Sequence, residues 1–445
     1  MRRVWVTGAG VLSPIGNGYE EFARGCLAGR SGIGPITLFD ASTFRHRIAG
    51  EVKGFSAEAL REAYPGVRRI RDRKVLLGLA AVEQAVRHAG LERSEVAGER
   101  SGVVLGVGLD VVLVDDIEGP AEDVEGAIGR RLGGLLASDD GWDRLIPTDT
   151  TPRWAAARWG IRGPCLANVG ACAAGAQALG HALRLIREGE ADLVLAGGTD
   201  SMVHPMGIGG FGLLGALSPR NDPPEEAIRP FDVSRDGTVL GEGAAVLVLE
   251  EAERARARGA RPLAVLLGYG ATLDAHAVTD PDPSGAGAVG AIRAALEDAG
   301  VPPEAVDYVS AHGTGTPKND VVETAAIRAA LGRRASSVPV SALKSMTGHL
   351  VAAAGAVEAL SCVVAFDRRC VPPTIHLRHP DPACDLDYVP GRAQPWDGVV
   401  ALSNSFGFGG QNAVLVLARP EVRDAEGRGG SAVGGGFLDP GRGSS

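Results

Sequence analysis

The sequence has no excess of positive charge, no paired cysteine motif and no long apolar run, and each absence excludes a class of protein. Its 445 residues carry a formal net charge of −9, whereas a nucleic-acid-binding protein needs a basic field to contact phosphates. The six cysteines include no C-x-x-C pair, which fits neither a disulfide framework nor a zinc site, so we expect no metal and a reducing, cytoplasmic compartment. No segment has the uninterrupted apolar length of a membrane span.

Aromatic residues are also scarce, at 4%, whereas 45% of the chain is hydrophobic and 64 residues are glycine. This composition favours close-packed α/β layers built from aliphatic and small side chains. Two halves repeat one pattern: strand-like segments 4–8 and 243–250 open and close the first, and segments 263–268 and 411–418 the second. Strands and helices alternate within each half, which predicts an internal duplication with mainly parallel sheets covered by helices.

One cysteine lies among unusually small residues. Cys172 stands in the stretch NVGACAAG, between Gly170 and Gly175, where an apolar helical run to Arg187 begins. The glycines permit a sharp strand-to-helix turn, and a thiol at a helix N-terminus meets the positive end of the helix dipole. We therefore predict a nucleophilic cysteine with a lowered pKa. The alternative is a buried structural cysteine.

Two downstream motifs favour the nucleophile. The first, AHGTGTPKND, places His312 on a Gly/Thr loop after a strand-like segment. The second, SALKSMTGH, places Lys344 and His349 between a short apolar strand and an Ala-rich helix over 350–366. A histidine at a strand end is often structural. Cys172 together with both histidines makes a nucleophile and two imidazoles.

Two carboxylates follow the first histidine motif. Asp320 and Glu323 have the spacing of a capping box, so we predict that they start the helix over 321–331.

On these motifs the chain resembles the β-ketoacyl-acyl-carrier-protein synthases that elongate by decarboxylation, members of the thiolase superfamily. The resemblance covers nearly all of residues 1–418. Its other motifs are RVWVTGAG at 3–10, AGRSGI at 28–33, GGFG at 209–212, RPFD at 229–232, RDG at 235–237 and SNSFGFGG at 403–410. Relatives that prime rather than elongate carry asparagine in place of His349, and chain-length-factor subunits lack the cysteine.

The resemblance implies a fold and a domain division. The fold is the five-layered αβαβα thiolase-like α/β fold, built from two duplicated halves. The first half, residues 1–258, carries the cysteine, and the second, residues 259–418, carries both histidines. Residues 419–445 are rich in Gly, Ser and charge and are predicted to be a disordered tail.

The resemblance also implies the catalytic roles. Cys172 accepts the acyl group. His312 and His349, as neutral imidazoles, donate to the malonyl thioester oxygen while enolate charge develops. Lys344 pairs with Glu358 and orients the histidines without carrying a proton.

Further positions are expected to contact the substrate. The backbone N–H groups of Cys172 and Phe408 form a second oxyanion hole, and Phe408 between two glycines acts as a gate. Thr314 and Thr316 bind the phosphopantetheine arm, although threonines in a Gly-rich loop are as often part of a turn. Phe211 and Leu109 line the acyl pocket.

A basic cluster is the expected docking site for an acidic carrier protein, since opposite charges steer association. An alternative is a solvated face. The cluster consists of Arg68, Arg69, Arg71, Arg73 and Lys74. No cofactor is expected apart from the phosphopantetheine of the carrier.

The favoured function is the ketosynthase subunit of a type II polyketide synthase, acting with acyl carrier protein and a homologous chain-length-factor subunit. Residues 110–153 favour it, because they depart from the pattern of fatty-acid enzymes and lie where a partner contact is expected. The alternative is a fatty-acid elongating 3-oxoacyl-ACP synthase II that acts as a homodimer.

Two other classes fit less well. A non-catalytic partner subunit would be expected to lack Cys172. The sequence TGAG at 7–10 after a strand resembles the start of a dinucleotide fingerprint, but Ser13-Pro14 stands where its third glycine and helix should follow.

Overall fold

The computed structural model describes residues 2–64, 66–67, 70, 72–109 and 147–420. Most of its strands form one 11-stranded sheet, with β2 paired to β1 at its side. The strands of this sheet are β1 Val4–Ser13, β2 Gly16–Asn17, β5 Ser101–Val107, β6 Cys165–Asn168, β7 Leu193–Ser201, β8 Glu242–Glu251, β9 Ala264–Leu273, β10 Tyr308–Ser310, β11 Val340–Ser341, β14 Val400–Gly407 and β15 Gln411–Ala418. Two small sheets pair β3 Ile33–Pro35 with β4 Ile48–Gly50, and β12 Cys370–Val371 with β13 Gln394–Pro395.

The sheet consists of two copies of one topology. The first half has the order β1-β8-β7-β5-β6 and the second has β9-β15-β14-β10-β11. In both, the first two pairings are antiparallel and the last two are parallel. A short antiparallel pairing of β1 with β9, from Val4↔Leu266 to Val6↔Ala264, joins the halves. The duplicated thiolase-like fold is thereby confirmed.

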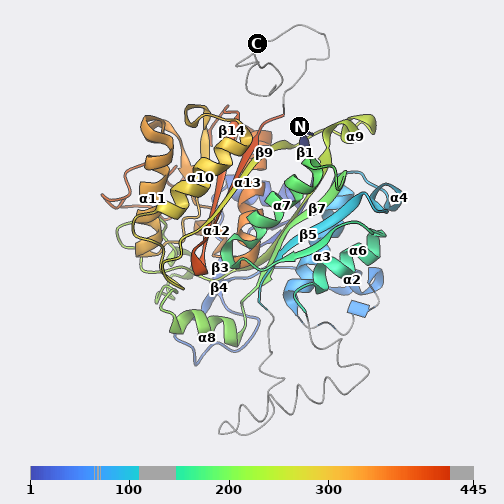
Figure 1. Ribbon diagram of the computed structural model, residues 1–445. Coiled ribbons are helices and arrows are strands. Elements are labelled where there is room, and N and C mark those ends of the chain that lie inside the picture. Colours follow the sequence, from blue (N-terminus) through green and yellow to red (C-terminus); the bar gives the residue numbers. More distant parts are fainter. Residues whose placement is uncertain (1, 65, 68–69, 71, 110–146, 421–445) are drawn as a thin grey trace, which may run out of the picture.

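The expectation of mainly parallel sheets was wrong, because four of the eight pairings within the two halves of the large sheet are antiparallel. β7 and β8 are neighbours and antiparallel, because the long connection over 202–241 leaves and returns at the same edge of the sheet. Its one helix, α8 Pro205–Leu213, lies beyond that edge (Figure 1) and does not return the chain to the opposite edge. A parallel neighbour would need such a crossover.

The helices form layers around and between the two halves (Figure 1). α7 and α13 pack against each other in the middle, α3 and α6 cover the first half, and α10 and α11 cover the second. The helices are α1 Tyr19–Leu27, α2 Glu58–Ala63, α3 Arg73–His88, α4 Arg93–Val96, α6 Thr150–Trp159, α7 Ala174–Arg187, α8 Pro205–Leu213, α9 Ala252–Ala257, α10 Ala286–Ala299, α11 Pro317–Leu331, α12 Lys344–Thr347 and α13 Ala354–Arg368. The predicted division at 258/259 falls between α9 and β9.

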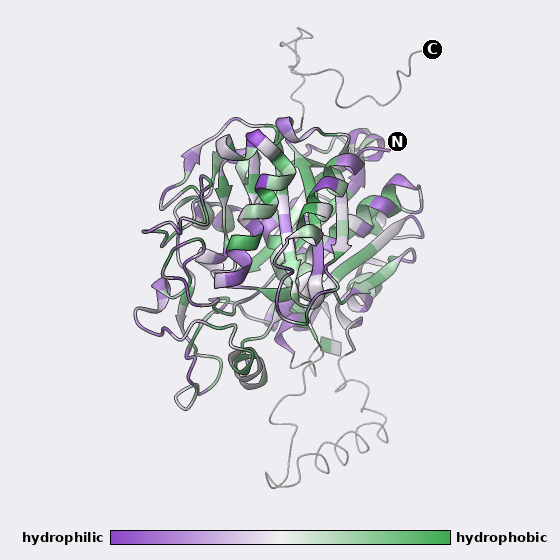
Figure 2. Ribbon diagram, turned by 60° about the vertical axis from the view of Figure 1, so that its left-hand side comes forward, coloured by the Kyte–Doolittle hydropathy of each residue, from purple (hydrophilic) through white to green (hydrophobic). Residues whose placement is uncertain are grey.

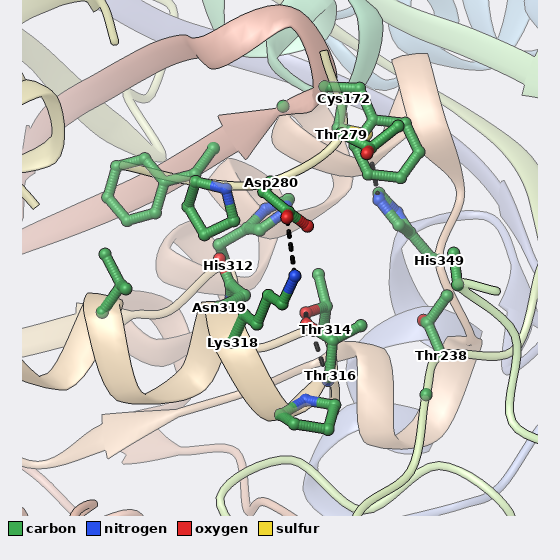
Figure 3. A pocket seen from close by; sticks show the side chains of 18 of the residues that line it. Cys172, Thr238, Thr279, Asp280, His312, Thr314, Thr316, Lys318, Asn319 and His349 are labelled. Carbon is green, nitrogen blue, oxygen red and sulfur yellow. Dashed lines mark hydrogen bonds and ion pairs between the residues drawn. The ribbon is translucent and has the colours of Figure 1, made fainter. Parts of the chain in front are cut away.

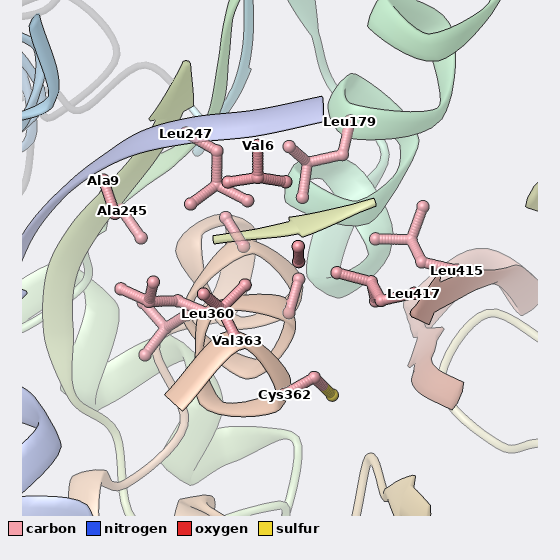
Figure 4. Close-up of a cluster of buried hydrophobic side chains, with 14 of the residues drawn as sticks. Val6, Ala9, Leu179, Ala245, Leu247, Leu360, Cys362, Val363, Leu415 and Leu417 are labelled. Carbon is pink, nitrogen blue, oxygen red and sulfur yellow. The ribbon is translucent and has the colours of Figure 1, made fainter. Parts of the chain in front are cut away.

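Buried side chains follow these layers. Alternate residues of β8 point to opposite faces, so Leu247 and Leu249 join the central core around α7 and α13, while Val246 and Val248 join the core under α3. Figure 4 shows the central core, where the helix residue Leu360 lies between strands of both halves. Hydrophobic colour is concentrated in the central elements and hydrophilic colour on the outer helices and loops (Figure 2).

The topology brings the sequence motifs to one place. β6 leads to Cys172, β10 to His312, β11 to Lys344 and β14 to Phe408. Because the last three strands of each half are parallel, their carboxyl ends point the same way. In each half, the motif residues therefore follow the carboxyl ends of neighbouring strands in the large sheet.

Candidate active site

Cys172 lies in a tight turn between a strand and a helix. β6 ends at Asn168, and the 3-10 segment η5 Ala171–Ala173 carries the cysteine directly into α7. Ala171 has φ +48°, a left-handed conformation that non-glycine residues rarely adopt. This turn holds the thiol at the N-terminal end of α7.

The second half has the same turn at the equivalent place. η9 Val351–Ala353 precedes α13, and Val351 has φ +45°. For a β-branched residue this backbone conformation is a clear outlier, and such strain is often found at functional sites. The N–H of Val351 donates to Nδ1 of His349 at 3.2 Å. The strained turn therefore fixes the ring of the histidine that precedes it.

Both histidines line the same cavity as the thiol (Figure 3). His349 Nε2 is 3.1 Å from Cys172 Sγ, and the centroids of the two imidazole rings are 5.4 Å apart. His349 Nδ1 accepts from Val351, so the neutral ring carries its proton on Nε2. Lys344 Nζ lies 3.2 Å from His312 Nδ1, and an ammonium can only donate, so His312 also carries its proton on Nε2.

Lys344 is held in place by a buried ion pair. It pairs with Glu358 and donates to the carbonyl oxygen of His312 at 2.7 Å. Lys344 and Glu358 are each only 1% exposed. Burial raises the pKa of Glu358 to about 7, and the adjacent ammonium opposes that rise.

The two carboxylates after the first histidine motif hold the loop rather than start the helix. Glu323 accepts from the backbone N–H groups of His312 and Gly313, both at 2.8 Å. Asp320 accepts from Gly315 N–H at 3.2 Å. The helix N-cap is instead Thr316, whose side chain makes no capping bond. The capping-box prediction was wrong because both side chains turn back toward the loop.

The pKa of Cys172 does not follow the expected direction. Burial raises it to about 11, although the backbone N–H of Phe408 and the charge of Lys344 act to lower it. The cysteine is 3% exposed, so loss of hydration outweighs these stabilising groups. Burial also lowers the pKa of His312 and His349 well below the usual value, and the charge of Lys344 adds to this effect. The imidazoles are therefore neutral.

A cavity of about 360 Å³ is lined by Cys172, His312 and His349. Thr314 and Thr316 lie on its wall, and their hydroxyl oxygens are 2.8 Å apart. Lys318 and Asp280 also line it and form an ion pair at 2.6 Å, drawn in Figure 3. Their side chains are 66% and 47% exposed, which marks the mouth of the cavity.

Two phenylalanines form another part of the wall. Phe211 and Phe408 stack with centroids 5.9 Å apart. Phe408 begins the segment η10 Phe408–Gly410, in which Gly409 has φ +76°. A glycine supplies this backbone conformation without strain.

Three residues that were predicted to contact the acyl chain or the carrier protein lie away from the cavity. Leu109 does not line the cavity and is 64% exposed. Lys74 is 1% exposed, because its ammonium pairs with Asp72, the N-cap residue of α3, and donates to the carbonyl oxygen of Leu109 at 3.1 Å. Arg73 binds the buried Glu242 at 2.6 Å. The prediction was therefore wrong for Lys74, which is too buried to form a docking surface, whereas the side chain of Arg73 stays 26% exposed and its docking role stays a prediction.

Several predicted features lie outside the described residues. They are Arg68, Arg69 and Arg71 of the basic cluster, residues 110–146 of the departing segment, and residues 421–445 of the tail.

Sequence reasoning missed Asp200. It lies at the end of β7, fully buried, and accepts from Ala352 N–H at 2.9 Å in the turn after His349. Burial raises its pKa to about 7. The sequence signal that could have identified Asp200 is an acidic residue at the end of an apolar, strand-like segment.

A second missed residue is Thr238, which lines the cavity and is 3% exposed. Its hydroxyl has no hydrogen-bond partner in the part of the chain that the structure describes. No sequence motif marks it beyond the neighbouring RDG at 235–237.

All six cysteines are free. Within the described ranges, no group of three or more His, Cys, Asp or Glu side chains is placed to hold a metal ion. No helix in the same ranges is long and apolar enough to cross a membrane.

Comparison with known proteins gives one consistent result. The family model for the beta-ketoacyl synthase N-terminal domain matches residues 1–255, and that for the beta-ketoacyl synthase C-terminal domain matches residues 263–378. A 3-oxoacyl-(acyl-carrier-protein) synthase 2 of Synechocystis sp. is 43% identical over 425 residues, which cover 94% of this chain and 98% of that protein.

Solved structures with the same fold include two assemblies. One is a type II PKS acyl-carrier protein in complex with its ketosynthase bound to the hexaketide, with 33% identity, a TM-score of 0.82, and coverage of 94% of this chain and 100% of that one. The other is the ishigamide ketosynthase/chain length factor, with 39% identity, a TM-score of 0.80 and the same coverage.

Proposed function

This chain belongs to the beta-ketoacyl synthase family, and from that premise we propose that it joins an acyl group to a malonyl thioester on acyl carrier protein by decarboxylative Claisen condensation. The observation that carries the proposal is the Cys172 thiol at a helix start, with two neutral imidazoles directing Nε2–H groups toward the same cavity. All six cysteines are free, which supports a reducing cytoplasmic location.

In the first half-reaction Cys172 sulfur attacks the carbonyl carbon of an acyl thioester. The carbon–sulfur bond to the pantetheine arm breaks, and the thiol proton of Cys172 ends on the departing sulfur. The backbone N–H groups of Cys172 and Phe408 hold the oxyanion. Because burial raises the pKa of the Cys172 thiol, only a small fraction of it is thiolate at neutral pH, and this fraction is the reactive species.

In the second half-reaction the malonyl unit loses its carboxylate as carbon dioxide. The electron pair of the broken bond becomes an enolate, whose oxygen accepts from His312 and His349. Its α-carbon then attacks the acyl carbonyl on Cys172, and the released thiolate takes a proton from solvent. Neutral donors suit this step, because they stabilise charge that develops only in the transition state.

Lys344 supports this step as a positioning residue. Its ammonium fixes the tautomer of His312 and is itself held by Glu358. The pantetheine arm enters the cavity past Thr314 and Thr316, whose hydroxyls lie on the wall. Arg68, Arg69, Arg71 and Arg73 remain the proposed contacts for the carrier protein.

Substituting each catalytic residue in turn tests this assignment. Cys172→Ala should prevent covalent acyl loading, seen by mass spectrometry of the intact protein. His312→Ala and His349→Ala should keep acyl loading measurable but slow carbon dioxide release from malonyl-carrier about 10²–10³-fold, the usual effect of removing one such donor. Wild-type rates of carbon dioxide release in both histidine variants would reject the assigned roles.

We place the chain in a type II polyketide system, as a ketosynthase that acts with a homologous chain-length subunit. Likeness to the ishigamide ketosynthase/chain length factor supports this assignment. The fatty-acid alternative has equal support, because the Synechocystis relative is a 3-oxoacyl-(acyl-carrier-protein) synthase 2 at 43% identity.

An elongation assay with and without the candidate partner separates the two. Poor turnover by the isolated chain and length-defined products with the partner support the polyketide assignment. Full, length-defined products from the isolated homodimer would favour the fatty-acid enzyme.

A further inference from the structure

The cavity contains one buried hydroxyl that the reaction above does not use. Thr238 lines the cavity and is 3% exposed, and its Oγ1 has no hydrogen-bond partner among the described residues. Figure 3 shows its side chain on the wall below His349. A buried hydroxyl without a partner lowers stability, so its presence at a substrate cavity indicates a partner supplied by the substrate.

Backbone pairing places Thr238 at the reacting end of the cavity. The N–H of His349 donates to the carbonyl oxygen of Val239 at 2.7 Å, and Leu240 forms an isolated parallel bridge with His349. The hydroxyl therefore stands beside the catalytic histidine. The exposed pair of Lys318 and Asp280 lies at the mouth instead.

The other donors near this position have partners or roles in the proposed reaction. The Nε2–H groups of His312 and His349 donate to the enolate oxygen, and the hydroxyls of Thr314 and Thr316 bond to each other. Lys344 is enclosed by Glu358 and His312. Among the described residues, Thr238 therefore offers the malonyl carboxylate a donor that the enolate does not use.

A single neutral donor suits a carboxylate that must be lost. A cation would stabilise the malonyl carboxylate strongly and oppose its departure as carbon dioxide, because only interactions stronger in the transition state accelerate the step. One hydroxyl can fix the direction of the breaking bond while holding the charge weakly.

We propose that the Thr238 hydroxyl donates a hydrogen bond to the carboxylate of the malonyl unit and orients it for decarboxylation. This specificity contact rests on the proposed function, since it requires a malonyl thioester in the cavity. The hydroxyl makes no contact with the acyl substrate in the first half-reaction.

The test compares two half-reactions in Thr238→Val, which replaces the hydroxyl with a methyl group of similar size. We expect kcat/KM for carbon dioxide release from malonyl-carrier to fall about ten- to hundredfold, as for loss of a hydrogen bond to a charged group. Acyl loading of Cys172 should stay within about twofold, since that substrate carries no carboxylate. Thr238→Ser should restore decarboxylation because it keeps the hydroxyl.

Stability supplies a second measurement that separates a substrate contact from a structural role. Thr238→Val removes an unpartnered group, so its melting temperature should equal or exceed that of the wild type. Thr7→Val is the matched control, because the Thr7 hydroxyl bonds to Glu250 at the far end of β8. This control should melt lower and keep both half-reactions unchanged.

Three results would overturn the inference. Equal losses in acyl loading and decarboxylation would assign the hydroxyl to the pantetheine arm, which both substrates share. Unchanged decarboxylation in Thr238→Val would remove any substrate role. A melting temperature of Thr238→Val below that of the wild type, together with equal losses in both half-reactions, would show that the hydroxyl has a structural role. Failure of the wild-type protein to load acyl groups on Cys172 would instead reject the proposed function.

Discussion

At the scale of single residues, burial governs the chemistry of this site. The thiol of Cys172 lies at a helix start, yet loss of hydration raises its pKa to about 11. The same loss keeps His312 and His349 neutral by lowering their pKa. In the proposed reaction, neutral imidazoles are the donors that stabilise the enolate. The same burial that lowers the thiolate fraction of Cys172 therefore also keeps both histidines in the form that the proposal requires.

Alkylation of Cys172 should therefore depend strongly on pH. With a pKa raised to about 11, the thiolate fraction grows about tenfold per pH unit through neutrality. We expect inactivation by iodoacetamide to accelerate from pH 6.5 to pH 9 without a plateau. Peptide mapping must assign the modification to Cys172, and the exposed Cys165 is the reference thiol. A rate that levels off below pH 8 would contradict a raised pKa.

Removal of Lys344 should cost more stability at high pH than at low pH. Lys344→Met leaves Glu358 buried without its counter-charge, which typically costs about 3–5 kcal/mol. Burial already raises the pKa of Glu358 to about 7 against the opposing effect of the ammonium, so loss of Lys344 raises this pKa further. Stability is therefore lost progressively as the pH rises from the unfolded pKa of about 4.3 toward the folded value, and the loss is complete only above the folded value. Denaturant unfolding should show a larger deficit at pH 8 than at pH 5.5.

The matched control is Lys344→Met combined with Glu358→Gln, which removes both charges. This double variant should recover most of the stability. A deficit that is equal at both pH values in the single variant would disprove the pH argument.

At the scale of elements, the site depends on the close contact of α7 with α13. A Cβ on Gly175 would lie 2.8 Å from the carbonyl oxygen of Ala352, and a Cβ on Gly355 would lie 2.8 Å from the backbone nitrogen of Ala176. Both glycines stand near the start of their helices, one turn after the strained residues Ala171 and Val351. The two helix starts, and with them Cys172 and His349, approach closely because neither glycine has a side chain.

Gly355→Ala should separate these helix starts. The new methyl group meets backbone that cannot move freely, so we expect a loss of about 1–3 kcal/mol in the free energy of unfolding. Condensation activity should fall in parallel, because the distance from Cys172 to His349 changes. Gly210→Ala in α8 is the control, since a Cβ there meets nothing within 4 Å. Equal stability of both variants would show that the contact tolerates a side chain.

At the scale of the whole molecule, one edge of the large sheet is open. β6 pairs with β5 on one side, and within the described part of the chain no strand pairs with its other side. Leu166 is 42% exposed and Val169, just beyond the strand, is 54% exposed. An edge strand with exposed apolar side chains favours pairing with another chain.

We predict that this edge is a dimer interface, in a homodimer or with a homologous partner. The double variant Leu166→Lys, Val169→Lys should shift the protein toward monomer, because it adds like charges at the edge. Light scattering coupled to size exclusion measures the mass. Circular dichroism should show an unchanged fold, since both residues are exposed. A variant that stays fully dimeric would place the interface elsewhere.

The sequence by itself determined which residues the candidate site contains and that the fold is duplicated. Cys172, His312, Lys344 and His349 stand in short motifs whose small neighbours and flanking strands mark turns, and these are local properties of the chain. The strand-like ends of the two halves likewise predicted the repeat, which the strand orders reproduce.

Only the tertiary structure decided the electrostatics and the long-range pairings. Lys74 counts as a surface charge in the sequence, but Asp72 and the carbonyl oxygen of Leu109 hold it in the interior. The pKa of Cys172 rises because distant segments exclude water from the thiol, which no local pattern reports. Thr238 meets the cavity through a backbone pairing with the His349 segment more than a hundred residues away. Such effects depend on what surrounds a side chain, and that is set by packing between segments far apart in the sequence.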